Sequence, residues 1–370
     1  MPETHAARRD RLRAMLADRP VDQAPPEPAE AALVTSGVNV RYLTGFAGSN
    51  CALLVTADSA ILATDGRYAQ VAARACPDVE LLIDRECALA VAARAAKDGI
   101  RRLAFEEHQV TVEMHARLSD AAAKTALVPL SRAVEVLRQV KDEEEIGCIR
   151  EACAISDRAL GEMLESILLG RAERHIAQEL ERRMMDHGAE GIGFDTIVAT
   201  GPNSAVPHHR PGDRRVEEGD FLKIDFGAVY RGYHADMTRT FVVGVEPADW
   251  QIEIYDLVFA AQKAGRQALA PGVDCRDVDA AARSVVTAAG YGDNFPHGLG
   301  HGIGLQVHED PLIGYAREGR LAARTPVTVE PGVYLPGRGG VRIEDTLVVR
   351  DVSDGGPELL TITTKELLVL

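Results

Sequence analysis

Two stretches in the second half of the chain constrain its fold most, because each has the pattern of a β-hairpin and carries acidic residues within it. They are LKIDFGAVYRGYHADMTRTFVV, residues 222–243, and VTVEPGVYLPGRGGVRIEDTLVV, residues 327–349. Apolar and aromatic residues flank a Tyr-Arg-Gly turn in the first stretch and a PGRGG turn in the second. Strand-like runs on both sides of such turns predict two antiparallel hairpins.

The expected register of these hairpins places their acidic residues in pairs. If the first hairpin is centred between the Tyr and the Arg of its turn, Asp225 lies opposite Asp236. If the second is centred on Gly337, Glu330 lies opposite Glu344. Opposite residues have Cβ atoms about 5 Å apart. Carboxylates at that separation repel one another unless a cation joins them, so the two hairpins predict a metal site.

Histidines lie in the loops around these hairpins. The run HGLGHGIGLQVHEDP contains His297, His301 and His308 among several glycines, and the upstream run GPNSAVPHHRPGD contains His208. Glycine allows the backbone to pass close to a site. Four carboxylates and one neutral imidazole balance the charge of two divalent ions, and this oxygen-rich set favours Mn²⁺, Co²⁺ or Zn²⁺. Two such ions can activate a shared water, so hydrolysis is the predicted reaction class.

The first third of the chain predicts a small α/β domain. Apolar runs of strand length alternate there with Ala- and Arg-rich stretches of helical spacing. A proline-rich stretch, PVDQAPPEP at residues 20–28, predicts a loop. The predicted strands are residues 31–35, 52–56, 60–64, 79–83, 102–105 and 126–130.

A second unit is predicted from residue 133 onward, so the expected domains are residues 1–132 and 133–370. Residues 141–169 repeat apolar side chains close to every 3.6 positions and predict a long amphipathic helix. The order of helices and strands after it indicates two similar αβ halves, which makes the fold class α+β. Further helices are expected at residues 174–186, 248–269 and 274–289.

The composition excludes several classes of partner. The 370 residues include 41 Lys and Arg against 56 Asp and Glu, a formal net charge of −15, and no segment gathers the basic residues into a stripe. We therefore expect no nucleic-acid partner. No uninterrupted apolar run reaches the roughly 18 residues of a membrane span, so no membrane partner is expected. The N-terminal residues mix charges and lack the apolar core of a secretory signal, and a cytoplasmic protein is expected.

The ordered motifs GPNSAVPHH, DFGAVYRGYHADMTRTF, HGLGHGIGLQVHEDP, VTVEPGVY and GVRIEDT resemble those of the pita-bread metallopeptidases, which include Xaa-Pro aminopeptidases, prolidases and methionine aminopeptidases. GVNVRYLTGFAGSNCALLV and TDGRY resemble the creatinase-type N-terminal domain of the proline-specific branch. The resemblance covers essentially the whole chain. It implies a pita-bread catalytic domain, with two αβ halves around a curved antiparallel sheet, preceded by a smaller α/β domain. It also implies a homodimer.

The resemblance assigns roles to individual residues. It implies two divalent metal ions, with Mn²⁺ expected and Co²⁺ or Zn²⁺ possible. His208, His297 and His308 would contact substrate, and His208, His308 and Glu330 would be catalytic. Arg342, two residues before Glu344, would orient the ligand carboxylates. The implied metal ligands are Asp225, Asp236, His301, Glu330 and Glu344.

The function expected from the sequence is that of an Xaa-Pro aminopeptidase, which removes the N-terminal residue of peptides with proline second. Dipeptidases of the family often have a basic residue soon after the His-Glu of the third motif, where this chain has Leu312. We therefore expect longer peptides to be preferred over dipeptides, and a prolidase is the nearest alternative. A creatinase-like metal-free C–N hydrolase and a non-catalytic binding protein of the same fold are further alternatives, and the complete ligand set argues against both.

Overall fold

The chain divides after Arg138 into two units, residues 1–138 and 139–370, each with a sheet and a core of its own. The structure is a computed structural model that describes residues 4–17, 28–166 and 168–370. Residues 20–27 of the predicted proline-rich loop lie outside the described residues. The first unit extends past residue 132 because Arg138, close to the end of helix α6, donates a hydrogen bond to Asn39 of the same unit.

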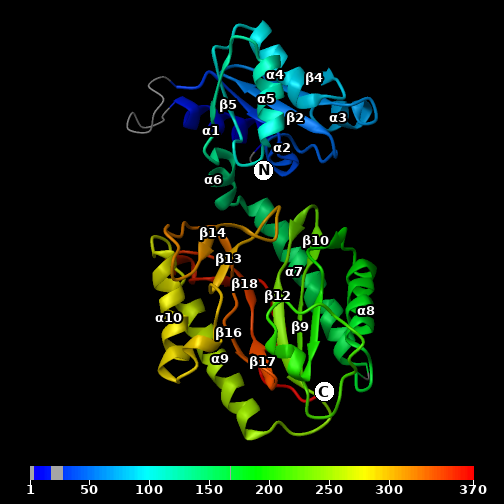
Figure 1. Cartoon of the computed structure of the whole chain (residues 1–370). Coiled ribbons are helices and arrows are strands. Elements are labelled where there is room, and N and C mark those ends of the chain that lie inside the picture. Colours follow the sequence, from blue (N-terminus) through cyan, green and yellow to red (C-terminus); the bar gives the residue numbers. More distant parts are fainter. Residues whose placement is uncertain (1–3, 18–27, 167) are drawn as a thin grey trace. The chain divides into compact units, whose positions relative to one another are not determined.

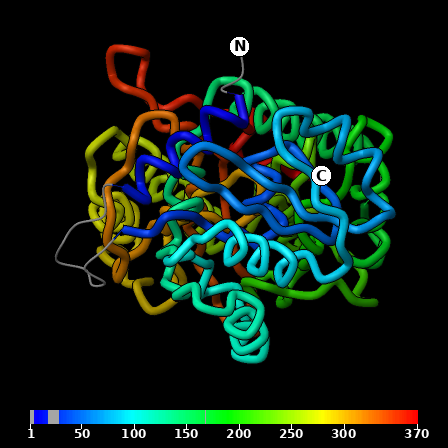
Figure 2. The backbone as a smooth tube through the Cα atoms, turned by 90° about the horizontal axis from the view of Figure 1, so that it is seen from above, coloured from blue at the N-terminus to red at the C-terminus, as the bar shows by residue number. Residues whose placement is uncertain are grey.

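The first unit is a mixed sheet in the strand order β4-β3-β2-β1-β5-β6, flanked by helices (Figure 1). Helix α4 packs its apolar side chains against β1, β2 and β3, and the course of the chain can be followed by colour in Figure 2. The predicted strands are confirmed to within a residue or so at their ends. The elements are α1 (His5–Ala17), β1 (Ala31–Val34), α2 (Gly37–Thr44), β2 (Cys51–Thr56), β3 (Ala60–Thr64), α3 (Ala69–Ala75), β4 (Glu80–Ile83), α4 (Cys87–Lys97), β5 (Arg102–Phe105), α5 (Val112–Ala121), β6 (Ala126–Pro129) and α6 (Ala133–Gln139).

A buried carboxylate organises one end of this sheet. Glu106 follows β5 and is fully buried. It accepts hydrogen bonds from the backbone N–H groups of Thr35 and Ser36, at 2.6 and 2.7 Å, and from the side-chain amide of Asn39, at 2.6 Å. These donors lie between the end of β1 and the first turn of α2. Glu106 therefore fixes the turn that connects these two elements.

The second unit consists of two αβ halves. In the first half, α7 and α8 pack on the sheet β12-β9-β8, and in the second half α9 and α10 pack on the sheets formed by β13–β19 (Figure 1). The four predicted helices are present. The elements are α7 (Glu143–Leu164), α8 (Glu173–Asp186), β7 (Gly191–Ile192), β8 (Ile197–Thr200), β9 (Phe221–Phe226), β10 (Ala228–Tyr230), β11 (Tyr233–His234), β12 (Met237–Val242), α9 (Asp249–Ala268), α10 (Cys275–Ala288), β13 (Gly300–Gly302), β14 (Glu309–Ile313), β15 (Pro326–Val329), β16 (Gly332–Leu335), β17 (Gly339–Arg342), β18 (Asp345–Val348) and β19 (Glu358–Leu359).

The two halves are joined by hydrogen bonds between β12 and the segment that links β17 to β18. The N–H of Glu344 donates to the carbonyl of Thr238 at 3.1 Å. The neighbouring Arg239 is almost fully buried, forms an ion pair with Asp345 at 2.8 Å and donates to the carbonyl of Glu344 at 2.5 Å. A buried guanidinium held by a carboxylate and by carbonyls has little freedom to move. This seam places the acidic residues of the two hairpins next to each other.

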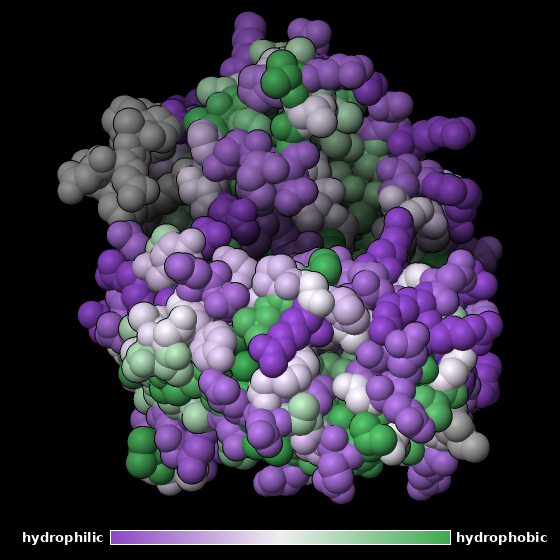
Figure 3. Space-filling model, turned by 60° about the horizontal axis from the view of Figure 1, so that its bottom comes forward, coloured by the Kyte–Doolittle hydropathy of each residue, from purple (hydrophilic) through white to green (hydrophobic). Residues whose placement is uncertain are grey.

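The face drawn in Figure 3 is mostly hydrophilic, and hydrophobic side chains occur on it in small groups between the charged ones. Exposed hydrophobic side chains in small groups are ordinary on protein surfaces. No helix in the described part of the chain combines the length and the apolarity that crossing a bilayer requires.

Replacing Glu106 with leucine should destabilise the first unit by about 3 kcal/mol or more, because the variant leaves several buried donors without an acceptor. Urea unfolding followed by circular dichroism measures this change. Glu113→Leu, on the exposed side of α5, is the matched control and should cost about 0.5 kcal/mol or less. Equal stability of the two variants would contradict the role given to Glu106.

Candidate metal centre and active site

The first hairpin turns one residue later than the sequence analysis placed it. Asp225 pairs with Thr238, so the expected pairing of Asp225 with Asp236 is wrong. The turn consists of Arg231 and Gly232, which both have positive φ, at 46° and 75°. A two-residue turn of this kind matches the twist of the strands, which explains why it is adopted here. Because Asp236 lies two residues before Thr238, it remains on the same face as Asp225, as a diagonal neighbour.

The second hairpin has the predicted centre. The pairs Gly332–Arg342 and Val329–Asp345 lie symmetrically about Gly337. Glu330 and Glu344 lie in the short breaks of the two strands, Glu330 between β15 and β16 and Glu344 between β17 and β18. Each carboxylate therefore belongs to a residue at which the hydrogen-bonded pairing of the strands is interrupted.

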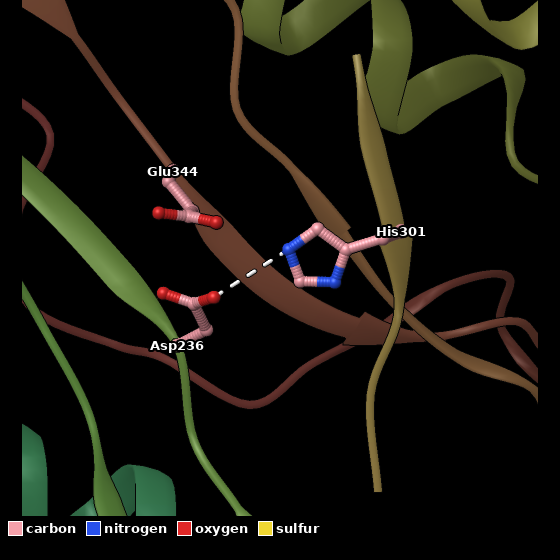
Figure 4. A group of neighbouring side chains, drawn as sticks. All are labelled: Asp236, His301 and Glu344. Atoms are coloured by element: carbon pink, nitrogen blue, oxygen red, sulfur yellow. Dashed lines mark ion pairs between the residues drawn. The ribbon is translucent and has the colours of Figure 1, made fainter. Parts of the chain in front are cut away.

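Three predicted ligands converge from three separate segments (Figure 4). One ligand atom each of Asp236, His301 and Glu344 lies within 4.8 Å of the others. Nε2 of His301 is 3.5 Å from a carboxylate oxygen of Asp236 and 3.6 Å from Oε1 of Glu330. Its Nδ1 is 3.0 Å from the carbonyl oxygen of Gly302. With Nδ1 donating to that carbonyl, Nε2 is left as an acceptor that faces the carboxylates.

Buried carboxylate oxygens at this place have no hydrogen-bond donor among the described residues: one oxygen each of Asp225, Asp236 and Glu344. Burial, followed by the charge of Asp225, raises the pKa of Asp236 well above its usual range. Burial and the charge of Asp236 do the same to the pKa of Glu344, and burial raises the pKa of Glu330. Orphaned, mutually repelling carboxylate oxygens beside an imidazole are the donor set that divalent cations bind. The residues present therefore fit a metal centre.

Arg342 connects this centre to a tyrosine and a histidine. Its Nη2 donates to Asp225, its Nε donates to the hydroxyl of Thr238 at 3.1 Å, and its Nη1 donates to the hydroxyl of Tyr334 at 2.8 Å. That hydroxyl lies 2.9 Å from Nε2 of His297. Burial lowers the pKa of His297 to about 4. The guanidinium thus orients the carboxylate of Asp225, an expected ligand, and the hydroxyl of Tyr334, which in turn contacts His297.

A cavity of about 460 Å³ opens onto these groups. The histidines with predicted substrate or catalytic roles all line it, together with Glu330, Arg342 and Leu312. The ring of His308 packs edge-on against the ring of His301, with centroids 4.4 Å apart. Burial, and then the neighbouring His301, lowers the pKa of His308 to about 4. The histidines at the cavity are His208, His297, His301 and His308.

His209 and Glu309, which directly follow His208 and His308 in the sequence, pair with other residues of the fold. His209 lies 2.8 Å from the buried carboxylate of Glu173. Glu309, next to His308 in the sequence, forms a buried ion pair with Lys141 at 2.9 Å. A Cβ atom at Gly304 would lie 2.8 Å from Cε of Lys141 and 2.9 Å from the carboxylate of Glu309, so a larger residue there would displace that ion pair.

Arg317, which lines the cavity, and Tyr334, whose hydroxyl contacts both Arg342 and His297, were not identified from the sequence. Tyr334 lies on the same strand face as Gly332 and Glu330 by alternation, but a tyrosine in an apolar strand is typical of a core residue. Arg317 follows β14 in an irregular loop, where no periodicity indicates the direction of its side chain. Only Tyr334 could have been found from the sequence, because it lies four residues after Glu330 and therefore on the same face of the strand.

Comparison with known proteins agrees with this geometry. The model of metallopeptidase family M24 matches residues 147–351, which is more than half of the chain, and the creatinase/prolidase N-terminal domain matches residues 8–140. The chain belongs to metallopeptidase family M24. Its second unit has the pita-bread fold of that family, and the first unit is the N-terminal domain that precedes it in relatives. Membership of this family implies divalent-metal binding, and Asp236, His301 and Glu344 form a cluster that could hold a metal ion.

Relatives named for proline-specific peptidases match over nearly their whole length. A protein of Pyrococcus horikoshii described as an Xaa-Pro dipeptidase is 35% identical over 353 residues, covering 92% of this chain and 94% of that relative. The solved structure of an Xaa-Pro dipeptidase from Bacillus anthracis is 36% identical, with a TM-score of 0.93 and coverage of 99% and 100%. That of an X-Pro aminopeptidase from Thermotoga maritima is also 36% identical, with a TM-score of 0.85 and coverage of 92% and 98%.

We predict that Glu344→Ala weakens divalent-metal binding at least about tenfold, since even partners outside the coordination sphere contribute that much to affinity. Calorimetric titration of the chelator-treated protein with Mn²⁺ measures this, and Asp236→Ala should behave alike. Metal addition should also raise the melting temperature of the unmutated chain by relieving carboxylate repulsion. Glu246→Ala, at an exposed acidic position, is the control. Unchanged Mn²⁺ affinity in Glu344→Ala would remove this residue from the ligand set.

Proposed function

We propose that this M24 metallopeptidase is an Xaa-Pro dipeptidase, which hydrolyses the bond before the proline of a dipeptide. One observation carries the proposal: Arg317 lines the same cavity as His208, His308 and Glu330. The names of the relatives from Pyrococcus and Bacillus also support it. From the sequence an aminopeptidase is expected, because Leu312 offers no charge at the place where dipeptidases of the family often have a basic residue.

Arg317 supplies the cation that Leu312 lacks. It follows Leu312 by five positions, and its backbone N–H donates to the carbonyl of Gly314 at 3.0 Å, which folds the loop back on itself. Its side chain is exposed at the cavity, and no carboxylate in the described part of the chain forms an ion pair with it. A free guanidinium beside a peptide pocket can bind the α-carboxylate of a dipeptide through two parallel hydrogen bonds. A longer peptide has a neutral amide at that position.

The remaining residues have complementary roles in the proposal. Asp225, Asp236, His301, Glu330 and Glu344 would hold two divalent ions, with Mn²⁺ the first candidate. When bound, such ions polarise the scissile carbonyl and lower the pKa of water. Glu330 would take the proton of the attacking water. His208 and His308, on the cavity wall, would donate hydrogen bonds to the developing oxyanion and deliver a proton to the leaving proline nitrogen.

The proline nitrogen explains why a dedicated site is needed. An Xaa-Pro bond is a tertiary amide without an N–H, and the pyrrolidine ring restricts the backbone on both sides. Its nitrogen must gain a proton to leave, and in this proposal His208 and His308, which line the cavity, deliver it. The Xaa-Pro aminopeptidase remains the second candidate, because the solved aminopeptidase of Thermotoga maritima is as identical to this chain as the dipeptidase of Bacillus anthracis.

Removing the guanidinium of Arg317 should raise KM for an Xaa-Pro dipeptide about tenfold and leave an Xaa-Pro-Yaa tripeptide nearly unaffected. Steady-state kinetics of Arg317→Ala with Mn²⁺ on Ala-Pro and Ala-Pro-Ala tests this. Arg320→Ala, three residues away in the same exposed stretch, should change neither value by more than about twofold. A wild-type chain that cleaves the tripeptide and spares the dipeptide would favour the aminopeptidase instead.

Replacing His308 with alanine should leave metal binding intact and lower kcat on the order of 100-fold, because the residue is assigned to the transition state and not to coordination. Calorimetry and initial rates are measured on the same preparation. Loss of metal together with normal turnover after reloading would show that His308 is a ligand.

A further inference from the structure

A buried lysine in β9 has no part in the roles assigned so far. Lys223 is fully buried, and strand alternation places it on the same face as Asp225. Its Nζ donates to the main-chain carbonyls of Ser204, Val206 and Pro207, at 3.0, 2.8 and 3.4 Å. It therefore binds a single short segment of backbone at three points.

Burying Lys223 costs more free energy than a residue that only fills space in the core would explain. Burying an ammonium group without a carboxylate partner costs several kcal/mol, and no ion pair of Lys223 occurs in the described part of the chain. The carbonyl dipoles and the ring of Tyr334, whose centroid is 5.0 Å from Nζ, offset part of this cost. The neighbours of Lys223 in β9 are apolar, and an apolar residue could occupy the position if only packing mattered.

The bound segment leads directly to His208. Pro207 and His208 both line the cavity. The segment has two further attachments to the opposite half: Nη1 of Arg342 donates to the carbonyl of Pro207 at 3.1 Å, and the N–H of Gly340 donates to the hydroxyl of Ser204 at 2.9 Å. Between residues 204 and 207 the backbone is thus held mainly through its carbonyl groups, and Lys223 binds most of them.

We infer that Lys223 is a positioning residue that sets the place of His208 in the cavity by binding the carbonyls of residues 204–207. It touches neither substrate nor metal and acts through the backbone. The inference rests on the proposed function in one respect, the catalytic role of His208.

The first test compares Lys223→Met with Lys263→Met, which changes an exposed lysine of α9. Lys223→Met should lower kcat/KM for the best Xaa-Pro substrate about tenfold or more, because misplacing a catalytic group by a fraction of an ångström is costly. It should also speed amide hydrogen exchange in residues 201–208, measured by mass spectrometry without substrate. Lys263→Met should change neither. Unchanged exchange in Lys223→Met would overturn the inference.

The second test asks whether Lys223 acts through His208. In a His208→Ala background, Lys223→Met should lower kcat/KM by no more than about twofold further, since the group it positions is already absent. A full additional tenfold loss would show a general structural effect and overturn the inference. If Lys223→Met does not fold, Lys223→Gln, which keeps two N–H donors, replaces it in both tests and should show a smaller loss. A wild-type chain inactive on all Xaa-Pro peptides would refute the proposed function, whereas the exchange experiment would still decide on the backbone contact.

Discussion

The repulsion among carboxylates buried together is the constraint on which the rest of the second unit depends. Asp225, Asp236 and Glu344 are buried, Glu330 beside them is half-buried, and burial raises the pKa of Asp236, Glu330 and Glu344. Such a cluster destabilises the folded chain unless opposite charge is supplied. Arg342 supplies one positive charge from within the chain, at Asp225. The orphaned oxygens that remain explain why a member of a metallopeptidase family keeps so unfavourable a cluster in its core.

The seam between the two halves makes the cluster possible. Each hairpin contributes its acidic residues from one half, and neither half could hold the complete set alone. Arg239 and Asp345 form an ion pair in which both side chains are buried, and Asp345 directly follows Glu344 in the sequence. This pair and the bonds between Glu344 and Thr238 cross the seam. The same contacts therefore stabilise the core and position the acidic residues. A change that loosens the seam is therefore expected to affect both.

The sequence predicts what depends on local patterns and fails where partners are distant. Strands and hairpins were predictable because alternation and turn residues are local signals, and Gly337 could be placed as a hairpin centre from symmetry alone. The first turn was misplaced by one residue because Arg231 adopts positive φ, which is uncommon for a residue with a side chain. Lys223 and Arg317 could not be assigned, since a charged residue in a strand or loop gives no sign of which distant backbone or pocket it meets.

Of the described residues that line the cavity, Arg342 and Arg317 differ in exposure to solvent, and this difference has a consequence for the effect of salt. Arg342 is almost fully buried, whereas Arg317 is exposed. Mobile ions screen exposed charges over about 8 Å at physiological ionic strength and reach buried pairs much less. Raising the ionic strength therefore weakens the attraction of anions to Arg317, while the contact between Arg342 and Asp225 persists. For any anionic ligand, the initial attraction to Arg317 is therefore sensitive to salt, whereas the buried contact of Arg342 with Asp225 is not.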